Sequence, residues 1–438
     1  MGSVMAQQDL VVQLSTGAIR GQTCSSSPAT SFLGIPYAKP PTGELRFMPP
    51  QPLSPNASQV GGIFEATQVA APRIQWGADF DVDNPTPSED CLYINVYTPA
   101  ETTNLSSLPV KVRAYGGGNI GGATSYPLYD ACSLATDAIV VTFNYRLGPL
   151  GFLALDSAGV KGNMAIQDYL AALGWVKENV ANFGGDSSKV LLFGQSSGAD
   201  DAFVVSTLPE ARSLISAAVF ESGGGLDIVP YEIAQLSGSS FAETLNCSTN
   251  DLIAGFQNTP ALAPGFGNGL SVSSNFAINA PNTTSLGQAV LDGQILKKQP
   301  LEFGSQIPII AGSNEFDATL FVLPVYLTSD QPLTEENYTD FLAQWAVVAA
   351  ITHIVTQSSY TCSSYKALRA AVSAGTPAYA YRVNHTPSCP WLWESGAEFP
   401  GPELADYFLS AHTAELPFVF GNLVNQPWGN GTCKITAA

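Results

Sequence analysis

A chain of 438 residues that is 45% hydrophobic and 12% charged is long enough for one very large globular domain and too apolar to be intrinsically disordered. Its formal net charge of −19 repels phosphate groups, which argues against nucleic acid and anionic membranes as partners. No uncharged apolar run reaches the roughly 18 residues of a transmembrane helix, so we expect no integral membrane segment.

Strand-like and helical segments alternate from the N-terminus onward. Gln8–Leu14 and Gly17–Gln22 are predicted to pair as a short hairpin, and Asn163–Phe183 carries apolar residues at helical spacing. The other expected strands are Tyr93–Tyr97, Val110–Tyr115, Ile139–Asn144, Lys189–Gly194, Ala217–Glu221, Ile307–Gly312 and Pro377–Val383. This alternation is typical of an α/β fold with a large, mostly parallel central sheet flanked by helices on both faces. No repeat or low-complexity linker divides the chain, so we predict one domain over residues 1–438.

Cysteines and glycosylation sequons indicate the compartment. Seven cysteines are too few for a disulfide scaffold, and their odd number leaves at least one without an intramolecular partner. The N-x-S/T sequons begin at Asn56, Asn104, Asn246, Asn282, Asn337, Asn384 and Asn430. The N-terminus has no apolar signal-peptide core, as in a mature chain whose signal peptide has been removed. We therefore expect a secreted protein that carries N-glycans.

The strongest local motif is Gly194-Gln195-Ser196-Ser197-Gly198, which fits G-x-S-x-G. It has the required context, because an apolar strand precedes it and the helix-compatible Ala199–Val205 follows. The sharp turn lifts the serine hydroxyl above the sheet, and the two glycines provide the clearance that such a turn needs. Ser196 is thus the predicted nucleophile.

A serine nucleophile needs backbone N–H groups that bind the negative oxygen of the intermediate. Tyr115-Gly116-Gly117-Gly118 follows a predicted strand, and glycines there let the substrate oxygen approach the backbone. We predict that the amides of Gly117, Gly118 and Ala199 form this oxyanion hole.

The general base is expected among the three histidines. His353 lies in a helix-like run and is expected to be partly buried. His385 follows a late strand, where this kind of fold places its base, but it lies inside the sequon at Asn384. His412 lies near the C-terminus. Residue type and position leave both His385 and His412 open.

The acid of the triad should lie between the serine and the histidine in the chain. The segment after strand Ile307–Ala311 offers Glu315 and Asp317, and either of them is equally compatible with a solvated loop carboxylate. Its function would be to hold the tautomer of the imidazole and to stabilise the imidazolium.

With these motifs in order along the chain, the sequence resembles the type-B carboxylesterase/lipase family, which includes cholinesterases and secreted fungal lipases. The resemblance runs from about Gly17 to Lys434 and is carried by Phe32-Leu33-Gly34-Ile35-Pro36-Tyr37-Ala38, Leu45-Arg46-Phe47, Glu89-Asp90-Cys91-Leu92-Tyr93-Ile94-Asn95-Val96, Tyr115-Gly116-Gly117-Gly118, Phe143-Asn144-Tyr145-Arg146, Phe183-Gly184-Gly185-Asp186 and Phe193-Gly194-Gln195-Ser196-Ser197-Gly198-Ala199. It implies an α/β-hydrolase fold and a serine esterase.

The resemblance also selects among the open alternatives. The spacing from Gly312 favours Asp317 over Glu315 as the acid, and the Glu-Leu-x-x-Val-Phe-Gly run that follows His412 favours it over His385. Ser222 resembles a serine that supports the triad, and Glu315 is expected beside it. Two structural ion pairs are also implied, Arg46 with Glu89 and Arg146 with Asp168.

Two departures from the family pattern stand out. The cysteine that usually pairs with Cys91 is missing, since the corresponding stretch reads Ala71-Pro72-Arg73-Ile74-Gln75. The chain is also short after His412 compared with the family.

The expected reaction is hydrolysis of a small-molecule carboxylic ester through an acyl-enzyme, without a metal or organic cofactor. Trp76 is interpreted either as an aromatic wall of the pocket or as core packing. Two alternatives remain: an acyltransferase or cyclase that uses the same serine, and a non-catalytic cholinesterase-like binding protein.

Overall fold

The computed structural model describes residues 10–54, 62–75, 86–245, 286–319, 351–384, 412–413 and 415–420. In this part of the chain the largest sheet has nine strands in the order β16-β15-β12-β11-β7-β8-β6-β4-β3. In chain order these are β3 (Gln22–Thr23), β4 (Thr30–Pro36), β6 (Tyr93–Thr98), β7 (Leu108–Ala114), β8 (Ile139–Phe143), β11 (Gly185–Gln195), β12 (Ala217–Glu221), β15 (Ile309–Asn314) and β16 (Ala378–Val383).

The predicted mostly parallel sheet is confirmed. Strands from β8 across to β16 pair in parallel, whereas β6, β4 and β3 continue the sheet in antiparallel pairing. The central strands are buried, and the side chains of β8 are buried at every position, as its Ile-Val-Val-Thr-Phe sequence predicts. The predicted hairpin also forms, from β1 (Val11–Leu14) and β2 (Gly17–Arg20).

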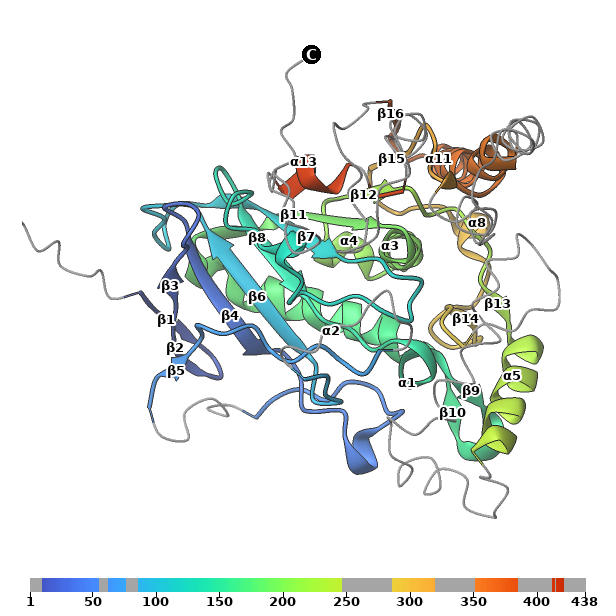
Figure 1. The fold of residues 1–438 in the computed structure, drawn as a ribbon, viewed down its shortest axis with the longest axis horizontal. Helices are drawn as coiled ribbons and strands as arrows, with labels where there is room; N and C mark the ends of the chain where they lie inside the picture. The colour runs from blue at the N-terminus through green and yellow to red at the C-terminus, as the bar shows by residue number, and fades with distance from the viewer. Residues whose placement is uncertain are drawn as a thin grey trace, which may run out of the picture.

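Helices pack against the sheet beside the strands that carry the site (Figure 1). The longest described helix is α2 (Met164–Asn179), and α3 (Ser197–Thr207) contacts β11 and β12. The helix α11 (Cys362–Ser373) lies against β15 and β16. The other described α-helices are α1 (Gly148–Phe152), α4 (Ala211–Leu214), α5 (Tyr231–Thr244), α8 (Pro300–Phe303) and α13 (Leu416–Phe420).

The predicted helix Asn163–Phe183 is shorter than expected at its C-terminal end. The regular helix α2 ends at Asn179, and a 3₁₀ turn continues over Val180–Phe183. Gly184 then adopts φ 83°, the left-handed conformation that ends helices and that glycine adopts without steric cost.

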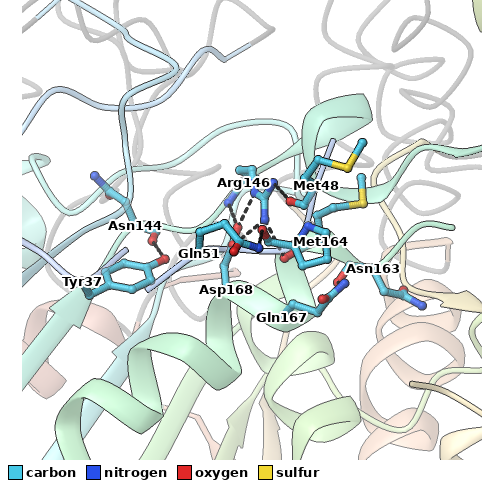
Figure 2. Close-up of polar contacts among 10 residues, drawn as sticks. Tyr37, Met48, Gln51, Asn144, Arg146, Asn163, Met164, Gln167 and Asp168 are labelled. Atoms are coloured by element: carbon cyan, nitrogen blue, oxygen red, sulfur yellow. Dashed lines mark hydrogen bonds and ion pairs between the residues drawn. The ribbon is translucent and has the colours of Figure 1, made fainter. Parts of the chain in front are cut away.

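Buried ion pairs hold the layers together. The Arg146 guanidinium lies 2.7 Å from Asp168 and also donates to the carbonyl oxygen of Met48 (Figure 2). Arg46 and Glu89 are paired as well, so both ion pairs implied by the resemblance are present. A third buried pair, Arg113 with Glu221, joins β7 to β12 and was not predicted.

The cysteines follow a pattern that the sequence did not reveal. Cys24 and Cys132 form a disulfide across a separation of 108 residues. Within the described residues Cys91 is a buried free thiol, which agrees with its missing partner. Arg73, in the stretch where that partner would be, is buried, with its guanidinium 5.4 Å from the ring centre of Tyr115. Among the described helices, none has both the length and the apolar character needed to cross a membrane.

Candidate active site

The turn between β11 and α3 carries Ser196 in a strained backbone conformation. Its φ of 56° and ψ of −132° lie in a region that residues with a side chain rarely adopt. The chain can fold this tightly because the flanking positions are glycines: a Cβ atom on Gly194 would collide with the backbone of Gly198, and one on Gly198 with the carbonyl oxygen of Tyr115. The Ser196 N–H donates to the carbonyl oxygen of Glu221 at 2.9 Å, which anchors the turn to β12.

The glycine-rich loop after β7 lies directly against this turn. A Cβ atom on Gly116 would lie 2.6 Å from the carbonyl oxygen of Gln195 and 2.8 Å from Cβ of Ser196. Gly117 and Gly118 have φ values of 125° and 61°, and within the described structure neither of their N–H groups donates a hydrogen bond. The two amides are therefore available beside the serine.

The prediction of Ala199 as the third amide donor is wrong. Its N–H already donates to the carbonyl oxygen of Ser196 at 2.8 Å, in the first turn of α3. Ser197 is the first residue of that helix, where the N–H has no intrahelical acceptor. The Ser197 hydroxyl accepts the Asn119 N–H at 3.1 Å and so joins the glycine loop to the turn.

His412 and Asp317 are brought together, although 95 residues separate them in the chain. The distance between His412 Nδ1 and Asp317 Oδ1 is 2.9 Å, and the second carboxylate oxygen accepts the Asn314 N–H at 2.7 Å. Both side chains are buried, Asp317 completely and His412 with 4% of its surface exposed. The carboxylate is thus fixed by hydrogen bonds at both oxygens.

The competing candidates do not lie in this arrangement. Glu315 turns toward Arg382 and forms an ion pair at 3.1 Å, which agrees with the alternative of a partly solvated loop carboxylate. His353 is exposed rather than partly buried, because it lies on the outer side of its helical turn. His385 and Trp76 lie outside the described residues.

The other ring nitrogen of His412 has an unexpected neighbour. The Nε2 atom lies 3.0 Å from Nε2 of Gln195, the residue before the serine. A carboxylate accepts at Nδ1, so Nδ1 carries the hydrogen and Nε2 accepts from the Gln195 amide. The Tyr360 ring covers the imidazole, with 5.0 Å between ring centres. The Nε2 atom therefore lies beside the side chain of the residue that precedes Ser196.

A buried carboxyl group, that of Glu415, is hydrogen-bonded to Asn314 beside Asp317. Glu415 accepts from the Asn314 side-chain amide, and its pKa is raised to about 8 by burial and by the nearby charges of Asp317 and Glu221. Asn314 therefore links this carboxyl to the carboxylate of Asp317.

Two adjacent carboxyl groups follow the serine on α3. Burial raises the pKa of Asp200 to about 6, and its Oδ1 accepts the Gly224 N–H at 2.7 Å. Burial and the charge of Asp200 raise the pKa of Asp201 well above its usual range. Asp201 accepts from the Asn119 side-chain amide at 3.3 Å and so supports the glycine loop.

Ser222 lies next to the turn, but its side chain makes no hydrogen bond with Asp317 or His412 in the described structure. It is buried at φ 50°, its N–H donates to the carbonyl oxygen of Gly312 at 2.9 Å, and its hydroxyl has no hydrogen-bond partner there. Among the described residues no group of three or more His, Cys, Asp or Glu side chains is arranged to hold a metal ion.

Several neighbours of the site were missed at the sequence level. Gln195, Asp200 and Glu415 lie one to four residues from the predicted Ser196 and His412, so proximity to those motifs was an available signal. Tyr360 reaches the site from the π-helical segment Thr356–Thr361, and nothing in the local sequence indicates that.

A mostly parallel sheet with a serine on a tight strand-to-helix turn, followed along the chain by an acid and a histidine, defines the α/β-hydrolase fold. Two solved structures share it: a PNB esterase (TM-score 0.74, 29% identity, covering 95% of this chain and 86% of that one) and the carboxylesterase EST55 of Geobacillus stearothermophilus (TM-score 0.72, 30% identity, covering 96% and 85%).

The sequence comparisons identify the family. The carboxylesterase family model matches residues 8–346, and the chain therefore belongs to the carboxylesterase family. Among curated relatives, carboxylesterase 1E of Rattus norvegicus is 33% identical over 76% of this chain, and the match covers 64% of the length of that relative. The para-nitrobenzyl esterase of Bacillus subtilis (strain 168) is 29% identical, over 94% of this chain and 83% of its own length.

Proposed function

We propose that this protein hydrolyses carboxylic esters of small molecules in two acyl-transfer steps, with Ser196 as the nucleophile, His412 as the base and Asp317 as the acid. The observation that carries the proposal is the 2.9 Å hydrogen bond between His412 and Asp317, with the opposite ring nitrogen 3.0 Å from the side chain of Gln195, the residue before Ser196. Family membership supports the ester as the substrate class.

In the proposed mechanism the proton of Ser196 moves to Nε2 of His412. The Gln195 amide occupies that lone pair in the free protein, so the serine hydroxyl replaces the amide when the substrate is bound. The imidazolium then protonates the leaving alcohol, and water releases the acyl group by the reverse sequence.

The oxyanion is proposed to bind the amides of Gly117, Gly118 and Ser197. This set keeps the two predicted glycines and replaces Ala199 by the residue directly after the nucleophile. One such donor contributes about 10²–10³-fold in rate in comparable sites.

The test combines covalent labelling with a serine variant. A fluorophosphonate should add to Ser196 in the intact protein, and Ser196→Ala should lower kcat/KM for p-nitrophenyl butyrate by at least about 10³-fold. Ser213→Ala, at an exposed serine on α4, is the matched control and should retain full activity. Labelling of a different residue, or full turnover by the alanine variant, would refute the assignment.

The alternatives give different results in the same assay. A transferase would form more ester or amide product than free acid when an alcohol or amine acceptor is added. A binding protein would give neither label nor turnover. A lipase would turn over emulsified long-chain esters faster than dispersed short-chain ones.

We also propose that the protein is secreted and glycosylated. The Cys24–Cys132 disulfide supports an oxidising compartment, and two of the sequon asparagines, Asn104 and Asn384, are exposed. Treatment of the native protein with a peptide N-glycosidase should reduce its mass; an unchanged mass would contradict the glycan proposal.

A further inference from the structure

The glycine-rich loop that carries the proposed oxyanion donors folds back on itself at Gly122. The φ of Gly122 is 103°, and a Cβ atom there would collide with the carbonyl oxygen of Gly116 and with the Tyr115 ring. Gly122 thus lies against the start of its own loop. Whatever fixes Gly122 therefore also helps to fix the segment from Gly116 to Gly122, which includes the amides of Gly117 and Gly118.

Both backbone polar groups of Gly122 are bound by one short segment from an earlier part of the chain. Arg73 donates from Nη2 to the Gly122 carbonyl oxygen at 3.3 Å, and the Gly122 N–H donates to Oε1 of Gln75 at 2.9 Å. The segment is itself anchored, because the Ser88 N–H donates to the carbonyl oxygen of Pro72 at 2.8 Å. Arg73 and Gln75 thus hold the end of the glycine loop at two points.

The Arg73 side chain also packs against the residue that begins the loop. It is buried, and its guanidinium carbon lies 5.4 Å from the ring centre of Tyr115 and 5.1 Å from that of Tyr145. These two rings stack with 4.7 Å between their centres, and the Tyr145 hydroxyl donates to the Tyr115 carbonyl oxygen at 2.6 Å. A cation is attracted to the face of an aromatic ring, so Arg73 binds the loop at both of its ends.

The stretch around Arg73 is where the family pattern has the cysteine that pairs with Cys91. Within the described residues Cys91 is a free thiol, and it lines one small cavity together with Arg73. In this chain the contacts that Arg73 makes from that stretch go to the glycine loop.

We propose that Arg73 and Gln75 are positioning residues, which hold the glycine loop so that the amides of Gly117 and Gly118 are placed to bind the oxyanion. Amide donors stabilise an oxyanion strongly when they are fixed in advance, and a displacement of about 1 Å can cost about 10²-fold in rate. Both residues act through Gly122 and not on the substrate. The inference rests on the proposed ester hydrolysis and adds two residues to the same site.

The experiment compares two ligands of nearly equal shape, of which only one forms an oxyanion. An alkyl trifluoromethyl ketone accepts the Ser196 oxygen at its carbonyl carbon, the serine proton moves to His412, and the carbonyl oxygen becomes the oxyanion. The corresponding secondary alcohol has the same carbon skeleton and cannot accept the serine. Arg73→Met and Gln75→Met should each reduce the preference for the ketone over the alcohol, measured as the ratio of inhibition constants, by about tenfold or more. They should lower kcat/KM for p-nitrophenyl butyrate by a similar factor.

Two controls separate positioning from a general loss of stability. Gln75→Glu keeps the oxygen that accepts from Gly122 and should retain the preference that Gln75→Met loses. Arg46→Met removes another buried guanidinium that lines the same cavity but is paired with Glu89. It should lower the free energy of unfolding and leave the preference for the ketone unchanged.

The outcomes are distinct. A wild-type preference in both Arg73→Met and Gln75→Met would overturn the inference, and so would a loss in Arg46→Met as large as that in Arg73→Met. If Arg73→Met does not fold, the comparison of Gln75→Met with Gln75→Glu decides. A wild-type protein that turns over no ester and binds the ketone no more tightly than the alcohol would contradict the proposed function instead.

Discussion

Both ring nitrogens of His412 have a side-chain hydrogen-bond partner in the described structure. Asp317 accepts from Nδ1, and the Gln195 amide donates to Nε2. An amide that donates to Nε2 opposes protonation of that nitrogen, whereas a carboxylate in its place would favour it. The pH dependence of turnover should therefore respond to the identity of residue 195.

We expect Gln195→Glu to move the acidic limb of the kcat/KM profile to higher pH by about one unit, because a carboxylate next to Nε2 stabilises the imidazolium. Gln195→Met is the matched control: it has a similar volume and lacks both the amide and the charge, so it measures the loss of the amide alone, and the glutamate variant should move the limb further than it does. The measurement is the pH dependence of p-nitrophenyl butyrate hydrolysis. An unchanged limb in the glutamate variant would show that residue 195 does not contact the base during turnover.

At this scale the sequence predicted one contact of the site correctly. His412 and Asp317, selected as base and acid by motif and resemblance, are joined by a hydrogen bond, whereas the catalytic roles of Ser196, His412 and Asp317 stay a prediction. Ala199 was the wrong choice because the amide donor is expected at the first residue of the helix, Ser197, and not at the residue that follows the motif. An N–H in the first helical position is free, whereas the one two residues later bonds back to the turn.

The elements around the site meet backbone to backbone, and glycines make this contact possible. The loop after β7 approaches the end of β11 so closely that a single methyl group on Gly116 has no space. The helix α2, by contrast, contains Gly174, where a Cβ atom would meet nothing within 4 Å. The same substitution at these two positions should therefore have opposite effects.

Gly116→Ala should lower kcat at least about 10²-fold, since the loop must move away from Gln195 and Ser196 and take its amide donors with it. Gly174→Ala should leave activity unchanged and raise the free energy of unfolding by about 0.5–1 kcal/mol, because alanine favours the helix. Ester hydrolysis and denaturant unfolding measure the two effects. Full activity of Gly116→Ala would show that the loop does not bind the oxyanion.

Strand positions were predictable because buried parallel strands are short and apolar, as in β8 and β12. The element ends were less predictable: β11 begins at Gly185, earlier than the apolar run, because backbone pairing with β7 extends to Leu108. The approach of Tyr360 to His412 depends on tertiary packing and has no local signal in the sequence.

At the scale of the whole molecule, the alternation of strands and helices predicts the class of the sheet. It does not predict the order of the strands, which is known only from the structure. The disulfide was not predictable, because 108 residues separate its cysteines and no spacing motif links them. That residues 1–438 form one domain stays a prediction.

The disulfide between Cys24 and Cys132 ties the segment before β4 to the segment before β8, and the Ser27 hydroxyl donates to the carbonyl oxygen of Cys132.

Closing so long a loop restricts the unfolded chain, so Cys24→Ser should lower the free energy of unfolding by about 2–4 kcal/mol. Cys362→Ser is the matched control, because that thiol is exposed and forms no disulfide within the described residues, and it should unfold like the wild type. Denaturant titrations of the oxidised proteins measure both. If a reducing agent destabilises the wild type as much as the cysteine substitution does, the cross-link itself is the cause. If neither has an effect, the loop is held by its packing, and the disulfide gives no support for an oxidising compartment.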